Sequence, residues 1–151
     1  MVTIEVGSVA DAWYELVTER GEFKLYLAER VIPYVRMTQA SKWHDSRAQD
    51  YLARQDAIRG MVREIMHRHD IEPFPPEVKL ALGCTFFGKY RGNTDLGNME
   101  KAVEDALQGV LYENDRQIRR RLAGGFFVDN GLEAAESKAQ VVGFEVEAVL
   151  L

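Results

Sequence analysis

The feature that most constrains the fold of this chain is an apolar run that leads, through a short basic loop, into an amphipathic helical pattern. The run spans residues 78–87, is flanked by proline and glycine, and fits a strand buried on at least one face. The loop, residues 88–94, contains Lys89 and Arg91. Because a helix N-terminus offers free N–H groups to a phosphate, this strand, loop and helix predict an α/β domain with an anion-binding end. The apolar residues at helical spacing are Leu96, Met99, Val103 and Leu107.

The remaining sequence predicts more strands and a second main helix around this unit. Residues 1–22 favour a short strand over Val2–Val6 and then a helical turn or two over residues 12–17. The helical spacing of residues 46–69 predicts a long helix with a capping box at its start. The fold class is therefore α/β (α+β), a small mixed β-sheet with two main helices. The other expected strands are residues 23–35 with a break at Pro33, 110–112, 117–122, 126–128 and 141–150.

Length and cysteine content narrow the class of protein. A chain of 151 residues with 46% hydrophobic content is long enough for one domain with a sound core. The single cysteine, Cys84, excludes an intrachain disulfide framework and a cysteine-based metal site. No apolar run approaches the roughly 20 residues that span a bilayer, and the N-terminus lacks signal-peptide features. We expect a cytoplasmic protein with no membrane partner.

The distribution of charge reverses what the net charge suggests. A formal charge of -5 argues against a protein that grips the phosphate backbone. Residues 1–22 and 129–151 each hold five acids and one base, which leaves residues 23–128 with a net charge of +3. Basic residues cluster on both sides of the helical pattern that begins after Asp95. The sequence therefore predicts a DNA-binding surface, formed by Arg36, Lys42, Lys89, Arg91, Arg116, Arg119 and Arg120.

The stretch from Asp95 to Ile118 places carboxylates at both ends of one short helix, with Lys101 between them. Carboxylate oxygens suit a hard divalent cation, and a cation beside a lysine suits an anionic substrate. The same residues also have a purely structural interpretation. Asp95 is equally well placed to be a helix N-cap, Asp115 to be a turn residue, and the polar helix face to be only solvated.

The same stretch resembles the signature of RusA-like Holliday junction resolvases. The match lies in the order Asp-Leu-x-Asn-x-x-Lys-Ala-x-x-Asp-Ala-Leu, then an aromatic, an acidic turn and Gln-Ile. The resemblance implies a small mixed α/β domain that forms a homodimer and cleaves branched DNA with Mg2+, or with Mn2+ in its place. It also implies a division into an acidic N-terminal extension, residues 1–22, packed on a RusA-like nuclease domain, residues 23–151.

Carried over residue by residue, the resemblance assigns catalytic roles to Asp95, Lys101 and Asp115 and metal binding to the two aspartates. The second family aspartate falls on Gly97. Three explanations stay open: a site with fewer carboxylates, replacement by Glu104, Asp105 or Glu113, or binding of junctions without efficient cleavage. The residues expected to support the site are Asn98, Asp105, Asn114 and Gln117.

Two functions follow from these features, and a third is weaker. The first is a homodimeric Mg2+-dependent endonuclease that resolves Holliday junctions or related branched DNA by paired cleavage. The second is a catalytically weakened relative that binds branched DNA or a replication or recombination partner. A nucleotide hydrolase would share the acidic site, but the sequence contains no Walker A motif.

Overall fold

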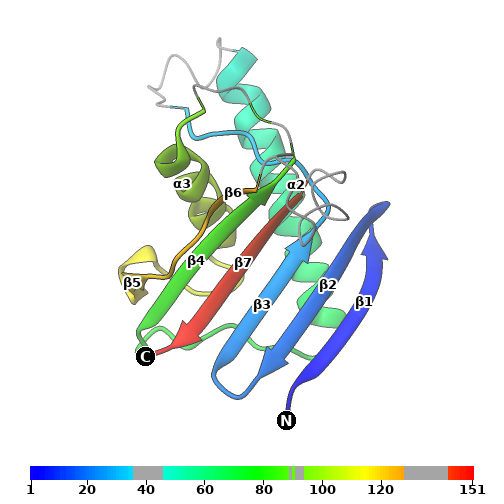
Figure 1. Ribbon diagram of the computed structural model, residues 1–151, viewed down its shortest axis with the longest axis vertical. Helices are drawn as coiled ribbons and strands as arrows, with labels where there is room; N and C mark the ends of the chain where they lie inside the picture. The colour runs from blue at the N-terminus through cyan, green and yellow to red at the C-terminus, as the bar shows by residue number, and fades with distance from the viewer. Residues whose placement is uncertain (36–45, 89, 91–93, 128–142) are drawn as a thin grey trace.

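A single mixed β-sheet carries both helices of the part of the chain that the structure describes (Figure 1). The computed structural model describes residues 1–35, 46–88, 90, 94–127 and 143–151. The strand order is β1-β2-β3-β7-β4-β5, and β6 also pairs with β4. The α+β fold class predicted from the sequence is confirmed. The elements are β1 Thr3–Val9, β2 Ala12–Glu19, β3 Glu22–Leu27, α2 Ser46–Arg68, β4 Leu80–Phe87, α3 Leu96–Leu107, the 3-10 turn η1 Asp115–Gln117, β5 Ile118–Arg121, β6 Gly125–Phe127 and β7 Gly143–Leu150.

The first 22 residues form strands, so the predicted helical turn over residues 12–17 is wrong. β1 and β2 pair as a hairpin whose closing pair is Val9 and Ala12. The two turn residues, Ala10 and Asp11, both have positive φ, as the favoured two-residue hairpin turns require. The apolar residues of β2 alternate between the faces of the sheet instead of following a helical stripe: Ala12, Tyr14 and Leu16 are buried and Trp13 is exposed. The sheet therefore extends through residues 1–22, and the expected domain division stays a prediction.

Helix α2 covers one face of the sheet and confirms the helix predicted for residues 46–69. Its buried side chains recur at helical spacing and contribute Tyr51, Ile58, Val62, Ile65 and Met66 to the core. Figure 1 shows α2 and α3 on the same side of the sheet. No helix among the described residues is long and apolar enough to span a membrane.

Strand β4 pairs with three other strands, and the chain continues from its end to α3. It runs antiparallel to β7 and parallel to β5 and β6. Close packing beside it explains two glycines: a Cβ on Gly83 would lie 2.8 Å from the Cβ of Leu122, and one on Gly124 would lie 2.0 Å from the Cys84 carbonyl oxygen. Since β5 begins beside the first residue of β4, the chain returns after α3 to the end of the sheet where β4 started.

Two other strand predictions need correction. The expected strand over residues 23–35 is confined to β3, and residues 28–35 form no strand. Residues 110–112 form a turn with an isolated bridge between Gln108 and Tyr112, because Gly109, with φ of 86°, reverses the chain directly after α3. The strands predicted for residues 78–87 and 117–122 correspond to β4 and β5, which are shorter. Those predicted for residues 126–128 and 141–150 correspond to β6, which begins one residue earlier, and to β7; residues 128, 141 and 142 lie outside the described part of the chain.

Candidate functional site

Asp95 is the N-cap of α3. Its Oδ1 accepts a 2.9 Å hydrogen bond from the backbone N–H of Asn98. The residue is exposed, and a carboxylate that accepts one hydrogen bond keeps further lone pairs for other ligands. The cap predicted from the sequence is therefore present, and it leaves the carboxylate accessible at the positive end of the helix.

Gly97 lies beside this carboxylate. A Cβ built on Gly97 would be 3.1 Å from Oδ1 of Asp95, and the glycine itself is exposed. An acidic side chain at this position would start close to the Asp95 carboxylate. The position to which the family resemblance assigns a second aspartate is thus exposed and lies next to the Asp95 carboxylate.

Lys101 is held between a carboxylate and an aromatic ring. Its Nζ is 3.8 Å from Oδ1 of Asp105 and 4.8 Å from the centre of the Tyr34 ring. Tyr34 is itself fastened to the start of α3, because its backbone N–H donates a 3.0 Å hydrogen bond to the Asn98 carbonyl. The Lys101 side chain remains 47% exposed, so the ammonium group is positioned yet open to a ligand.

Asp105 is supported from α2. The Tyr51 hydroxyl donates to Oδ2 of Asp105 at 3.4 Å and accepts a 2.6 Å hydrogen bond from Nε2 of Gln55. Burial, and secondly the Asp105 carboxylate, raise the pKa of Tyr51, so its hydroxyl stays protonated and can donate. Tyr51 and Gln55 were not predicted as site residues, and nothing in their local sequence marks this contact across helices.

Glu104 points to the other side of α3 and is paired with Arg121 of β5. The guanidinium Nη1 hydrogen-bonds Oε1 of Glu104 and lies 3.8 Å from Oε2 of Glu100. Glu104 is 8% exposed. Burial raises the pKa of Cys84, and the carboxylates of Glu104 and then Glu100 raise it further. Glu104 is thus buried and already neutralised by Arg121, whereas Asp105 is engaged by Lys101 and Tyr51.

Hydrogen bonds of the neighbouring residues hold the turn that contains Asp115 in place. Asn114 caps η1, its Oδ1 accepting from the Arg116 backbone N–H at 2.9 Å. Gln117 is buried: its Oε1 accepts from the N–H groups of Glu113 and Asn114, at 2.9 and 3.1 Å. Its Nε2 donates to the carbonyls that precede β4, those of Pro75 at 2.8 Å and Val78 at 3.2 Å. Asn114 and Gln117 therefore fix the turn that presents the exposed Asp115.

Within one chain, Asp95 and Asp115 lie towards opposite ends of α3. Asp95 caps the N-terminus of the helix, and Asp115 follows the turn beyond its C-terminus, next to the start of β4. A 12-residue helix spans about 18 Å. No group of three or more His, Cys, Asp or Glu side chains within the described ranges could hold a metal ion. The two aspartates of a single chain therefore do not fit one Mg2+ ion.

The predicted DNA-binding residues fall into two sets. Arg116, Arg119 and Arg120 are exposed along η1 and β5. Their neighbour Arg121 forms ion pairs with α3 instead. The others lie outside the described residues: Arg36, Lys42, Lys89 and Arg91.

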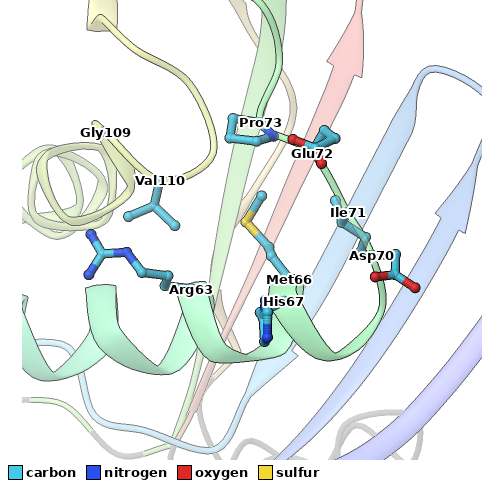
Figure 2. Close-up of a pocket in the computed structure, with 9 residues that line it drawn as sticks. All are labelled: Arg63, Met66, His67, Asp70, Ile71, Glu72, Pro73, Gly109 and Val110. Atoms are coloured by element: carbon cyan, nitrogen blue, oxygen red, sulfur yellow. The ribbon is translucent and has the colours of Figure 1, made fainter.

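A pocket of about 280 Å³ lies elsewhere, between the last turns of α2 and the turn after α3 (Figure 2). Figure 2 shows Arg63 and Met66 of α2 facing Val110, with Glu72 and Pro73 across from them. Both acidic and basic side chains line this pocket, and no site residue predicted from the sequence does. The pocket therefore adds nothing to the candidate site.

The geometry of α3 and η1 belongs to a segment that matches a known family. Residues 32–133 match the family endodeoxyribonuclease RusA. The matched segment is about two thirds of the chain and includes every predicted site residue. The chain belongs to the RusA endodeoxyribonuclease family, whose members resolve Holliday junctions. No curated protein matches the chain. The resemblance found in the sequence is thereby confirmed, whereas the roles of individual residues are not tested.

Proposed function

We propose that this protein is a homodimeric, Mg2+-dependent endonuclease that resolves Holliday junctions or related branched DNA by paired phosphodiester cleavage. The observation that carries the proposal is the match of residues 32–133 to the RusA family, because this segment includes α3 with Asp95 at its cap and Lys101 in its body. Family membership supports nuclease activity in general. The metal, the dimer and the residue roles are parts of the proposal.

The separation of the two aspartates gives the dimer a role in the metal site. We infer that a two-fold axis brings Asp115 of one copy towards Asp95 of the other. In a two-fold interface each contact between residues i and j occurs twice, so one such dimer would contain two equivalent sites. Two sites related in this way suit the cleavage of two strands of one junction.

Each residue then has a distinct task. Asp95 and Asp115 would hold Mg2+, which when bound lowers the pKa of a water molecule and neutralises charge on the phosphate. Lys101 would stabilise the negative charge that develops on the phosphate oxygens, and Asp105 and Tyr34 position its ammonium group. Asn98 supports Asp95 through its backbone N–H.

DNA affinity would come from the exposed arginines that continue from Asp115. Arg116, Arg119 and Arg120 follow it along η1 and β5, so a phosphate backbone bound there would pass the site. Such contacts are independent of base sequence and weaken with salt.

Cleavage of a synthetic four-way junction in Mg2+ tests the proposal. The wild type should nick symmetry-related strands, and Asp95→Asn and Asp115→Asn should each abolish nicking while binding persists. Lys101→Ala should reduce cleavage much more than binding. An equal loss of both would give Lys101 a binding role only.

Mixing the two inactive variants tests the shared site. A dimer with one Asp95→Asn and one Asp115→Asn subunit would keep one intact site if each site combines residues of both copies. It should therefore recover single-strand nicking. If each site lay within one chain, no intact site would remain and the mixture would stay inactive.

The second function, binding without efficient cleavage, is favoured by Gly97. It predicts that the wild type binds the junction without nicking it in Mg2+ or Mn2+. That result would refute the enzyme proposal.

A further inference from the structure

Strand β1 forms an edge of the sheet, and a row of exposed apolar side chains runs along it from the residue just before its start. Val2, Ile4 and Val6 are 50%, 61% and 58% exposed. Alternate residues of a strand share a face, so the three side chains lie together. Within the described sheet β1 pairs with β2 alone, and Figure 1 shows it at the border of the sheet farthest from β5. An apolar edge strand of this kind is a template for pairing with another strand.

The hairpin register identifies which backbone groups face outward. Val9 and Ala12 close the two-residue turn, and the closing pair of such a hairpin exchanges both backbone hydrogen bonds. Every second residue back from Val9 therefore faces β2. The intervening residues, Val2, Ile4, Val6 and Ser8, direct their N–H and C=O groups away from the sheet.

Arg68 already occupies one of these outward backbone groups. Its Nη1 donates a 2.5 Å hydrogen bond to the Ser8 carbonyl oxygen. This contact agrees with the register, because it shows the Ser8 carbonyl directed away from β2. The outward groups that remain for pairing belong to Val2, Ile4 and Val6, the same residues whose apolar side chains are exposed.

We propose that two copies of this chain pair through β1 as antiparallel strands, with Ile4 opposite Ile4 of the second copy. In this register Val2 lies opposite Val6, so all three apolar residues of the exposed face meet apolar partners. On the other face Thr3 lies opposite Glu5, and no like charges oppose each other.

The neighbouring registers are worse for stated reasons. Centring the pair on Glu5 would place two carboxylates directly opposite each other, which destabilises an antiparallel pair. Centring it on Val6 would pair Ile4 with Ser8, whose carbonyl is occupied by Arg68. The Ile4 register ends where the Arg68 contact begins.

This contact is separate from the dimer proposed for DNA cleavage. β1 is four strand positions from β4, and neighbouring strands are about 4.8 Å apart. Copies joined at β1 would keep their α3 helices roughly 40 Å apart, so they could not share a metal site. β1 also precedes residues 32–133, the part matched to the nuclease family. The pairing would link nuclease dimers to one another, and it stands whether or not the protein cleaves DNA.

Cysteine cross-linking tests the register. Ile4→Cys should form a disulfide with a second copy of itself, because opposite residues in a hydrogen-bonded pair have Cα atoms about 5.5 Å apart, within disulfide range. Val6→Cys alone should cross-link much more slowly, whereas a mixture of Val2→Cys and Val6→Cys should cross-link readily. The native Cys84 is 2% exposed and does not compete. Equal rates for Ile4→Cys and Val6→Cys alone would overturn the proposal.

Light scattering tests the contact without new thiols. Ile4→Lys places a charge on the exposed apolar row, and it should abolish the rise in mean mass with protein concentration that we expect of the wild type. Thr3→Lys is the matched control: it adds the same charge opposite Glu5 of the second copy and should behave as the wild type does. Identical masses for the wild type and Ile4→Lys at all concentrations would contradict the pairing. Junction nicking, measured on the same samples, should be unchanged by Ile4→Lys.

Discussion

The ammonium nitrogen of Lys101 lies 4.8 Å from the centre of the Tyr34 ring, which places an aromatic residue beside the lysine assigned to the phosphate. Tyr34→Leu should therefore lower junction cleavage by about two- to fivefold, the worth of an exposed cation–π contact. Tyr34→Phe keeps the ring and should retain wild-type cleavage. Single-turnover rates and junction affinities of both variants measure the effect. Equal losses in the two variants would show that the hydroxyl matters and the ring does not.

Gly97→Asp should strengthen the metal site. A side chain there starts 3.1 Å from Oδ1 of Asp95, so a second carboxylate would join the first at the N-terminus of α3. We expect Mg2+ affinity to rise by roughly tenfold and cleavage to rise with it. Gly97→Asn is the control of equal size without the charge. Titration of cleavage against Mg2+ concentration, supported by calorimetry, distinguishes the two variants, and an identical response would refute the role assigned to this position.

Gln117→Leu should destabilise the fold by roughly 3 kcal/mol, because it leaves buried backbone groups at two sites without their partner. The side chain bonds two N–H groups beside η1 and two carbonyls before β4. Asn114→Ala removes only an exposed cap and should cost about 1 kcal/mol. Urea denaturation of both variants gives the comparison. A cost for Gln117→Leu no larger than that of Asn114→Ala would mean that water replaces these hydrogen bonds.

The protein should lose stability in alkali. Burial, and then the Glu104 carboxylate, raise the pKa of Tyr112 above its ordinary value of 10.0, and burial does the same for Tyr51. The unfolded chain releases these protons near pH 10 while the folded chain keeps them, so stability is complete below that pH and falls as pH rises above it. Each group contributes a slope of about 1.4 kcal/mol per pH unit.

Tyr112→Phe tests this slope. The variant loses the 2.6 Å hydrogen bond from the hydroxyl to the Glu104 carbonyl, so its stability at neutral pH should be lower by about 1 kcal/mol. Above pH 10 its free energy of unfolding should fall less steeply than that of the wild type. Parallel slopes in urea denaturation at several alkaline pH values would exclude the contribution of Tyr112.

The elements that the sequence predicted well are those whose patterns are local. The spacing of apolar residues in α2 and α3, the cap at Asp95 and the apolar run of β4 each depend on residues close in sequence. β2 was mistaken for a helix because apolar residues close together on a short segment fit both periods. Only pairing with β1 and β3 decides between them.

The site was predictable only as far as its motif. Asp95, Lys101 and Asp115 could be named from spacing and family resemblance. Contacts between distant segments could not: Tyr34 beside Lys101, Tyr51 beside Asp105, and the separation of the two aspartates along α3 all depend on packing. Glu104 carried a local signal that was not used, since a buried carboxylate on the apolar face of α3 requires a charge partner, and the half-exposed Arg121 is that partner.

Strand β7 lies between β3 and β4, although it follows every other strand in the chain. During synthesis the hairpins of β1 to β3 and the unit around β4 would emerge first, each with an open edge that only β7 can fill. The sheet can therefore form as one cooperative unit only after β7 has left the ribosome, and contacts between segments so far apart in sequence make folding slow. Until that moment the nascent chain exposes two unpaired strand edges, so we expect its dependence on chaperones to end with the arrival of β7.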